Sequence, residues 1–333
     1  MSHEPIQKIS VVVPARNEAE TIRALLDALL GQSLKPNEIV ITDGGSIDQT
    51  RAIVQEFIDR GAPVKLCTDQ DSMPGRSRNI GVANADHEWI AFIDAGVTPV
   101  GTWLQSLADK VINETDAEVV YGSYEPVTES LFEESAAIAY VPPPQNTDEG
   151  PVRPYSIASA LMLKQAWEKA GGFPEDLRSA EDLLFMNKVE AAGFRIARAP
   201  RAVVHWTLQP GLWKTFRRFI VYSHNNIRAG LWRNWQAPLL RRYLILMATA
   251  LPAIFFGVKW LMVPLALWLA LLAARATRAL WQNRQCYPAG LRRNFSRFIV
   301  IVAILATLDF ATLVGTLVWI VTDLPAKNAR ARF

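Results

Sequence analysis

The chain has 333 residues, enough for one large α/β domain with an appendage or for two ordinary domains. Its net charge of +3 is the sum of two parts with opposite charge. Residues 1–200 contain 17 Lys and Arg and 30 Asp and Glu, whereas residues 201–333 contain 18 Lys and Arg and 2 Asp. The second half also holds 8 of the 11 Trp, and its arginines flank long apolar runs. This pattern indicates a membrane-facing part and excludes nucleic acid as the favoured partner, because a nucleic-acid-binding region carries its positive charge on a soluble face.

The two cysteines, Cys67 and Cys286, are far apart in the sequence and show neither metal-ligand nor redox spacing, which fits a reducing compartment. The N-terminus has no apolar segment long enough for a signal peptide and runs directly into a predicted strand. We therefore expect an integral membrane protein whose first half lies on the cytoplasmic side.

Strand and helix patterns alternate from residue 6 to about residue 120. The first helix is expected to begin at a capping box made by Asn17 and Glu20, and the fourth to open at Thr98 and Pro99. The predicted strands are Ile9–Val13, Glu38–Thr42, Val64–Thr68, Glu88–Ile93 and Ala117–Tyr121, and the helices are Ile22–Leu30, Asp48–Arg60, Arg76–Ala85 and Thr98–Val111. This alternation predicts a mostly parallel sheet covered by helices on both faces, and ligands of such sheets bind at the carboxyl ends of the strands.

Residues 125–155 interrupt the pattern with several prolines, and we expect a lid, a binding loop or a disordered insert there. The fold is expected to resume with a segment at Ile157–Leu163, helices around Lys164–Ala170 and Ala180–Ala192, and a strand near Ala202–His205.

The last third of the chain predicts membrane contact. Residues 212–235 mix arginines and aromatic side chains, which is typical of a helix in a membrane interface, with a basic surface helix of a soluble domain as the alternative. Tyr243–Ala274 has Lys259 as its only charge, and it predicts a hairpin of two short or tilted helices turning there, or a re-entrant pair. Phe298–Thr322 is a cleaner span that only Asp309 interrupts. The predicted divisions are a domain at 1–210, interfacial amphipathic helices at 211–238 and about three spans at 239–325.

The arginines between Arg275 and Arg297 indicate the cytoplasmic side by the positive-inside rule. Two crossings are then expected in the hairpin, and the third span would leave the C-terminus on the far side. An ionised side chain in the middle of a span is costly, so Asp309 is expected to face another helix or a lipid head group.

Two polar segments follow successive predicted strands, at Pro14–Glu18 and at Asp43–Thr50. A carboxylate at a strand end, followed by two glycines and a helix start, lets a ligand approach the backbone closely. Asp43 can accept a hydrogen bond from a ring N–H of a nucleobase, and Asp48 can cap the next helix. Either segment alone is a weak signal, but the two at successive strand ends are far more specific.

Here the sequence resembles the family 2 glycosyltransferases, which have the GT-A fold, over residues 8–206. The resemblance rests on the segments VVVPARNE, ITDGGSIDQT, GRSRNIGVANADHEWIAFIDAG and GGFPEDLRSAEDLLF. It implies an α/β domain with a mixed, mostly parallel sheet flanked by helices, followed here by C-terminal transmembrane helices. It also implies a nucleoside-diphosphate sugar as donor, with a UDP-sugar favoured.

The resemblance assigns roles to the residues of the donor pocket. In the family, the first aspartate of the second segment contacts the base of the donor, a role that falls on Asp43. Pro14, Arg16 and Glu18 would line the same pocket. The segment with Arg76, Arg78 and Asn79 would face the nucleotide or its phosphates, with a solvated helix charge as the alternative for Arg78.

The family's next landmark is an Asp-x-Asp that holds a divalent metal and the donor. This sequence has Asp94-Ala95-Gly96, so the second carboxylate is missing. The resemblance implies Mg²⁺ or Mn²⁺, since such an ion neutralises a diphosphate and prefers oxygen ligands. Its ligands would be Asp94 and His205, with a structural role as the alternative for His205. The missing carboxylate leaves the dependence on metal open.

In the family, the aspartate of a late acidic pair is the general base, and that role falls on Asp182, with Glu181 orienting the acceptor. A carboxylate at a helix N-terminus stays ionised and can take the proton of an attacking hydroxyl, which inverts the anomeric carbon. The Gln-x-x-Arg-Trp signature of processive members is absent, which favours transfer of one sugar, and the membrane segments suggest a lipid or membrane-proximal acceptor.

The alternative is a catalytically silent sugar-nucleotide-binding or scaffold protein on the same fold, suggested by the incomplete Asp-x-Asp. A nicotinamide-dependent enzyme is excluded, because no Gly-x-Gly-x-x-Gly follows the first strand.

Overall fold

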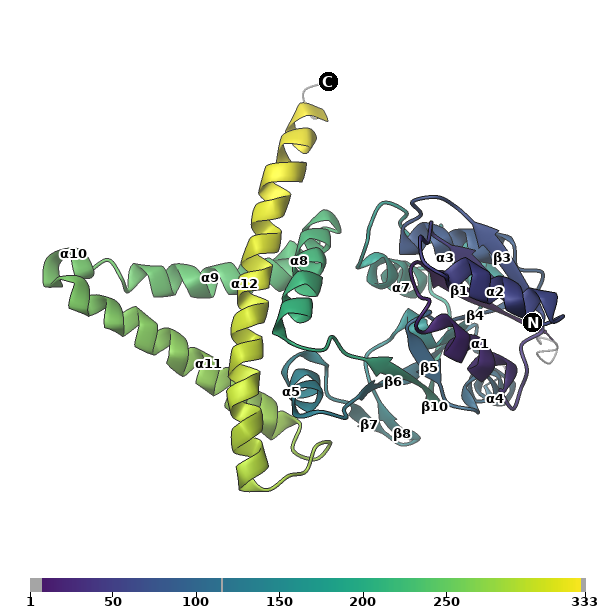
Figure 1. The fold of residues 1–333 in the computed structure, drawn as a ribbon, viewed down its shortest axis with the longest axis horizontal. Helices are drawn as coiled ribbons and strands as arrows, with labels where there is room; N and C mark the ends of the chain where they lie inside the picture. Colours follow the sequence, from purple (N-terminus) through teal and green to yellow (C-terminus); the bar gives the residue numbers. More distant parts are fainter. Residues whose placement is uncertain (1–7, 115, 331–333) are drawn as a thin grey trace. The chain divides into compact units, whose positions relative to one another are not determined.

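The structure is a computed structural model that describes residues 8–114 and 116–330 (Figure 1). The expected absence of a signal peptide concerns residues 1–7, which lie outside the described residues. The chain forms two compact units: Met1–Val127 with Pro144–Thr207, and Thr128–Pro143 with Leu208–Phe333. The first unit ends close to the predicted domain end at 210, but Thr128–Pro143 belongs to the second unit.

The first unit is built on one eight-stranded sheet. Its strands are β1 Ile9–Ala15, β2 Glu38–Asp43, β3 Val64–Thr68, β4 Trp89–Phe92, β5 Val97–Pro99, β6 Val119–Val127, β9 Ala160–Leu163 and β10 Ile196–Thr207. They are ordered β3-β2-β1-β4-β9-β6-β10-β5, and β7 Gln145–Thr147 pairs with β8 Gly150–Val152 in a separate ribbon. The first four strands pair in parallel, as do β6 and β10, whereas β9 and β5 run antiparallel to their neighbours. The predicted mixed, mostly parallel sheet is confirmed.

Helices cover both faces of this sheet, which explains why its central strands are apolar along their whole length. The helices of the unit are α1 Ile22–Leu30, α2 Thr50–Asp59, α3 Pro74–Ala83, α4 Trp103–Asn113, α6 Lys164–Lys169 and α7 Glu181–Ala191. Val11 and Val13 of β1 pack in one core with Leu26 of α1, whereas Val12 packs in the other core with Val82 of α3. The four parallel strands therefore bring their carboxyl ends, and the polar segments that follow them, to one edge of the sheet.

Three local predictions are wrong. Asn17 does not cap α1, because it has a left-handed backbone (φ 58°) and its side chain binds another loop; Thr21 precedes the helix instead. Thr98 and Pro99 belong to β5, and α4 begins only at Trp103.

The third error concerns residues 125–155, which are not a long loop. They contain the end of β6, helix α5 Leu131–Tyr140 and the β7–β8 ribbon. Ser130 and Glu133 form a capping box at the start of α5, with the Ser130 side chain accepting from the Glu133 N–H. This capping signal is present in the sequence, but the prolines around it favoured the prediction of a loop.

The second unit consists of helices. Besides α5 these are α8 Leu212–Arg228, α9 Trp232–Ala248, α10 Ala253–Phe256, α11 Met262–Gln282 and α12 Leu291–Arg330, with a 3-10 turn at Val258–Leu261. In the described part of the chain, three helical stretches are long and apolar enough to cross a membrane: Trp232–Phe256, Val258–Gln282 and Leu291–Pro325. The predicted hairpin that turns near Lys259 is confirmed, and Figure 1 shows α9 and α11 running out crosswise from α12 to meet at α10. We call residues 232–282 the hairpin.

Two further features of this unit bear on the predictions. The segment predicted at 211–238 is divided between α8 and α9. Helix α8 packs closely along α12: a Cβ at Gly315 of α12 would lie 2.6 Å from the Ile220 carbonyl oxygen of α8.

Asp309 of α12 faces Arg275 of α11, with 2.6 Å between Arg275 Nη1 and Asp309 Oδ2. The prediction that Asp309 faces another helix is confirmed.

Candidate active site

The loops that follow β1 and β2 are tied together. The backbone N–H of Asn17 donates to Ser46 Oγ (2.8 Å), and the N–H of Ile47 donates back to Asn17 Oδ1 (2.9 Å). The N–H of Glu18 donates to Thr50 Oγ1 (2.8 Å). The two polar segments therefore form one surface at the carboxyl end of the sheet. Sequence reasoning missed this function of the hydroxyls, because small polar residues in a loop give no signal of their partner.

Asp43 is buried at the end of β2, and its carboxylate is held by its own loop. It accepts from the N–H groups of Gly45 (3.2 Å) and Ser46 (3.1 Å), and Arg51 Nε lies 3.7 Å away. Asp48 Oδ1 accepts from the N–H of Thr50 at 3.0 Å, but the N-cap residue of α2 is Gln49, which makes no side-chain capping bond, so Asp48 is not the capping residue that was predicted.

The other three residues assigned to the donor pocket surround this loop. Pro14 lies within β1 beside Thr42 of β2. Arg16 is partly exposed and pairs with Asp71 (3.2 Å). Glu18 Oε2 accepts from the Thr21 hydroxyl at 2.7 Å.

Arg78 joins two of the candidate acids. Its side chain is only 4% exposed, and it donates through Nη2 to Asp94 Oδ1 (2.7 Å) and through Nη1 to Glu181 Oε1 (2.8 Å). Burial alone would lower the pKa of Arg78, but the charges of Asp94 and Glu181 raise it above its usual value, so the group stays charged. Arg78 thus brings the end of β4, helix α3 and the start of α7 together, and a solvated helix charge is excluded.

The acidic pair begins α7 after a strained residue. Ala180 has a left-handed backbone (φ 69°), which is unfavourable for a residue with a Cβ. Burial raises the pKa of Glu181 and of Asp182 above their ordinary values, and the charge of Arg78 opposes the rise in both. Asp182 accepts at Oδ1 from the Leu183 N–H (2.8 Å) and remains partly exposed. The Asp182 carboxylate is therefore open to solvent in part, whereas Glu181 is enclosed.

Asn79, which the resemblance assigns to the nucleotide or its phosphates, has a positioning role that the sequence did not predict. Its Oδ1 accepts from the Phe173 N–H and from Trp167 Nε1, both at 2.9 Å, and its Nδ2 donates to the Phe173 carbonyl (2.9 Å). A Cβ at Gly172 would lie 2.9 Å from Asn79 Oδ1, so the glycine permits this contact. The segment that leads to the acidic pair is thereby fastened to α3.

The residues assigned to a metal do not form a metal site by themselves. Among the described residues, no three His, Cys, Asp or Glu side chains come together as possible ligands. Asp94 is 40% exposed and shares Oδ1 with Arg78, while His205 is exposed on β10 opposite Thr98. At Gly96, a Cβ would lie 3.9 Å from Glu18 Oε2. The side chains therefore do not fit a metal held by the protein alone.

Comparison with known proteins identifies part of the chain. Residues 10–169 match the family model described as Glycosyl transferase family 2. This stretch is a family 2 glycosyltransferase domain. The match includes Asp43, Arg78 and Asp94, and it ends before the acidic pair Glu181 and Asp182.

Among curated proteins, the pre-mycofactocin glycosyltransferase of Mycobacterium tuberculosis (strain CDC 1551 / Oshkosh) is 29% identical over 208 residues, which cover 59% of this chain and 42% of the relative. The succinoglycan biosynthesis protein ExoA of Rhizobium meliloti is 27% identical over 281 residues, which cover 78% of this chain and 82% of the relative. The chain thus spans less than half of the mycobacterial relative's length.

Among solved structures, the mannosyltransferase PcManGT of Pyrobaculum calidifontis, in complex with GDP-Man and Mn²⁺, matches with a TM-score of 0.55 at 20% identity. The match covers 94% of this chain and 88% of that chain. It supports the GT-A fold of the glycosyltransferase domain.

Proposed function

We propose that this protein is an inverting glycosyltransferase that moves one sugar from a nucleoside-diphosphate sugar to a hydroxyl or phosphate of an acceptor at a membrane. The observation that carries the proposal is the link from Asp94 through Arg78 to Glu181, which neighbours Asp182. It joins a donor-side residue to the acidic pair. A UDP-sugar is the favoured donor.

In the proposed reaction, Asp182 takes the proton of the acceptor hydroxyl as its oxygen attacks the anomeric carbon. The bond from that carbon to the diphosphate oxygen breaks, and the nucleoside diphosphate leaves. Asp182 suits this role because it is partly exposed at the start of α7, where the helix dipole favours a carboxylate. Arg78 is a positioning residue here, since it holds Glu181 and thereby the start of α7.

Donor binding is proposed for the surface formed by the loops after β1 and β2. Asp43 would receive the ring N–H of the base, with Pro14, Arg16 and Glu18 around it. Asp43 accepts from the N–H groups of Gly45 (3.2 Å) and Ser46 (3.1 Å), and its two carboxylate oxygens keep further lone pairs that can receive the base N–H.

The expected Mg²⁺ or Mn²⁺ is retained as a proposal, with Asp94 and His205 as the residues to test. When bound, such an ion would neutralise charge on the leaving diphosphate. Because the described side chains do not complete its coordination, we expect most ligands to come from the donor and water. EDTA should abolish transfer, with restoration by Mn²⁺, while Asp94→Asn should raise the Mn²⁺ concentration required. Full turnover in EDTA would remove the metal from the proposal.

The decisive experiment is Asp182→Asn, measured as sugar transfer to membrane lipid extracts with UDP- and GDP-sugars. Loss of a general base should lower turnover by about two to four orders of magnitude, with donor affinity nearly unchanged. The matched control is Asp109→Asn, an exposed acid of α4. Normal turnover in Asp182→Asn would contradict its role as base. Nucleotide binding without turnover in the unmodified protein would favour the silent scaffold instead.

A membrane-proximal acceptor is proposed because the glycosyltransferase domain shares its chain with three helical stretches apolar enough to enter a bilayer. We place the domain on the cytoplasmic side, since Arg241 and Arg242 precede the hairpin tip and Arg275 and Arg278 follow it.

A further inference from the structure

We propose that α12 lies along the membrane surface instead of crossing the bilayer, so that the hairpin is the only part of the described chain that penetrates deeply. The proposal concerns the second unit alone and does not depend on the reaction. It departs from the third span that hydropathy favours, and it rests on polar contacts near both ends of α12.

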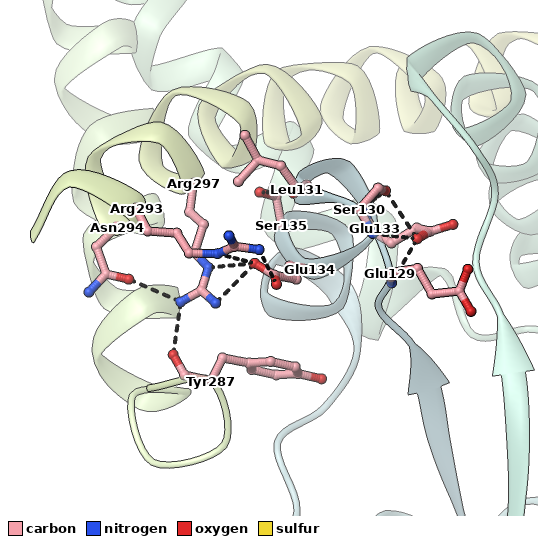
Figure 2. Close-up of polar contacts among 10 residues, drawn as sticks. All are labelled: Glu129, Ser130, Leu131, Glu133, Glu134, Ser135, Tyr287, Arg293, Asn294 and Arg297. Carbon is pink, nitrogen blue, oxygen red and sulfur yellow. Dashed lines mark hydrogen bonds and ion pairs between the residues drawn. The ribbon is translucent and has the colours of Figure 1, made fainter. Parts of the chain in front are cut away.

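The start of α12 is fixed to α5 by an ion cluster (Figure 2). Glu134 of α5 lies between Arg293 and Arg297, with 3.1 Å from Arg293 Nε and 3.0 Å from Arg297 Nε to its Oε2. Arg297 is 3% exposed and also donates to the carbonyl oxygen of Tyr287 (2.8 Å) and to Asn294 Oδ1 (3.1 Å). Removing one partner would leave a buried charge, so this contact holds α12 beside α5.

The far part of α12 is fixed to α8 in the same way. Asp323 Oδ2 lies 2.6 Å from His224 Nε2, and its Oδ1 lies 3.5 Å from Arg228 Nε. Between the two ends, the Ser223 hydroxyl donates to the Thr312 carbonyl at 2.8 Å. Polar groups of α5 and α8 thus contact α12 near its start, at 293–297, and in its second half, at 312–323.

Both partner helices begin on the same side of the membrane as the glycosyltransferase domain. The chain leaves β6 at Val127 and enters α5 at Leu131, and it leaves β10 at Thr207 and enters α8 at Leu212. Links of this length reach at most about 18 Å, whereas a hydrocarbon core is about 30 Å thick.

Helix α8 is also too polar to carry its own end across. Its 17 residues span about 26 Å, less than a hydrocarbon core of about 30 Å. Lys214, Arg217 and Arg218 are exposed in its first two turns and Arg228 lies in its last, and a charge costs about 2.5–3.5 kcal/mol at the centre of a bilayer. Both ends of α8 therefore stay on the domain side, and with them both ends of α12.

The surface of α12 fits a helix lying in the plane of the membrane. From Phe295 onward, its exposed large apolar side chains are Phe295, Ile299, Phe310, Leu317, Ile320 and Val321. At 3.6 residues per turn they fall within about 100° of the helix circumference. Arg297 and Gly315, which contact α5 and α8, lie on roughly the opposite side. A helix with one apolar face toward lipid and the other side toward protein can lie in the plane of the membrane as well as cross it, and the polar contacts near the two ends of α12 carry the choice between the two.

The hairpin has the surface of a segment embedded in lipid. Its base is fixed at Asp309, which accepts from Arg275 (2.6 Å) and from the Tyr243 hydroxyl (3.2 Å). From these two residues to the turn at Gly257, the limbs are about 21 and 27 Å long at 1.5 Å per residue. Lys259 is the only charge between them, and its long side chain can reach toward the far head groups from that depth.

The test is cysteine labelling of the full chain in sealed membrane vesicles of both orientations. Single-cysteine variants are made in a Cys67→Ala, Cys286→Ala background, and a membrane-impermeant maleimide is applied. Ala52→Cys on the surface of α2 marks the domain side, the native Cys286 marks the start of α12, and Ala329→Cys marks its end. Cys286 is exposed between α11 and α12. Transfer activity and reaction in detergent show that each variant is folded and that its thiol is reactive.

We expect all three positions to react when the maleimide is on the domain side of the vesicle membrane. None of them should react when the maleimide is on the opposite side. The matched control is Phe255→Cys near the hairpin turn, which should react in detergent but not from the domain side of sealed vesicles. Reaction of Ala329→Cys only from the opposite side, or from neither side, would overturn the proposal. Reaction of Phe255→Cys from the domain side would overturn it as well.

Discussion

Arg78 shows how a single buried charge can connect a donor motif with a distant acidic pair. It is fixed between Asp94 and Glu181, and Phe173 lies beneath its guanidinium at 5.4 Å from the ring centre. The sequence places Arg78 on a helix after a strand but not its partners, because these are 16 and 103 residues away. Arg78 acts on Asp182 through charge: burial raises the pKa of Asp182, and Arg78 opposes the rise.

Replacing Arg78 with Gln should therefore change the pH dependence of transfer. As the proposed base, Asp182 must be ionised to accept a proton, so activity should fall as pH falls through the pKa of Asp182. Without the positive charge of Arg78, the pKa of Asp182 should rise further. The acidic limb of the kcat–pH profile should then move to higher pH, and the plateau value of kcat should be lower. The measurement is kcat against pH, with circular dichroism to confirm folding.

Arg78→Lys is the matched control, since it retains the charge and loses the two-sided geometry. The acidic limb of its pH profile should lie closer to that of the unmodified protein than the limb of Arg78→Gln does. This should hold even if the plateau value of kcat is lower. If the acidic limb of Arg78→Gln lay at the same pH as that of the unmodified protein, Arg78 would support the structure of α7 without changing the pKa of Asp182.

At the scale of elements, the sequence predicts buried strands and apolar helices well and misjudges connections. Strand β1 and helix α1 can be predicted from the sequence. The first is a continuous apolar run, as expected for a strand buried on both faces, and the second has the apolar spacing of an amphipathic helix. Helix α5 was missed because its main partner, α12, lies more than a hundred residues further along the chain. Asn17 was read as a cap because only the folded chain brings Ser46 and Ile47 to it.

The close packing of α8 on α12 gives a test at this scale. A side chain at Gly315 would collide with the Ile220 carbonyl oxygen (2.6 Å from a Cβ) and with Ser223. Gly315→Val should therefore destabilise the second unit by about 1–3 kcal/mol, the usual cost of overpacking. The measurement is thermal unfolding in detergent micelles. Gly290→Val is the control, because nothing lies within 4 Å of a Cβ there; equal unfolding temperatures for the two variants would contradict the α8–α12 contact.

At the scale of the whole molecule, an acidic glycosyltransferase domain is followed by a basic, apolar region. The domain has its own two cores on the faces of one sheet. The membrane region is therefore expected to determine where the reaction occurs more than whether the donor binds.

Replacing residues 249–266 with a Gly-Ser linker should separate these two properties. We expect nucleotide affinity to stay near that of the unmodified protein, while transfer to membrane lipids falls sharply and alkaline carbonate extracts the variant from membranes. Calorimetry with UDP and GDP and a sedimentation assay measure the two effects. The control is Lys259→Ser, which preserves the hairpin; loss of nucleotide binding in the linker variant would show that the domain depends on the membrane region.

Helix α5 has a consequence for how the protein is made. Its partner Arg293 is 159 residues further along the chain, so at about 5–20 residues per second α5 leaves the ribosome some 8–30 s before it can pair. During that interval Glu134 lacks its arginines, and Ile138 lacks the cover of Ile301 and Leu305. The glycosyltransferase domain can close around its own sheet meanwhile, while α5 remains an unprotected apolar helix. Nascent chains stopped before residue 291 should therefore recruit chaperones at residues 131–140, and release from them should coincide with the synthesis of α12.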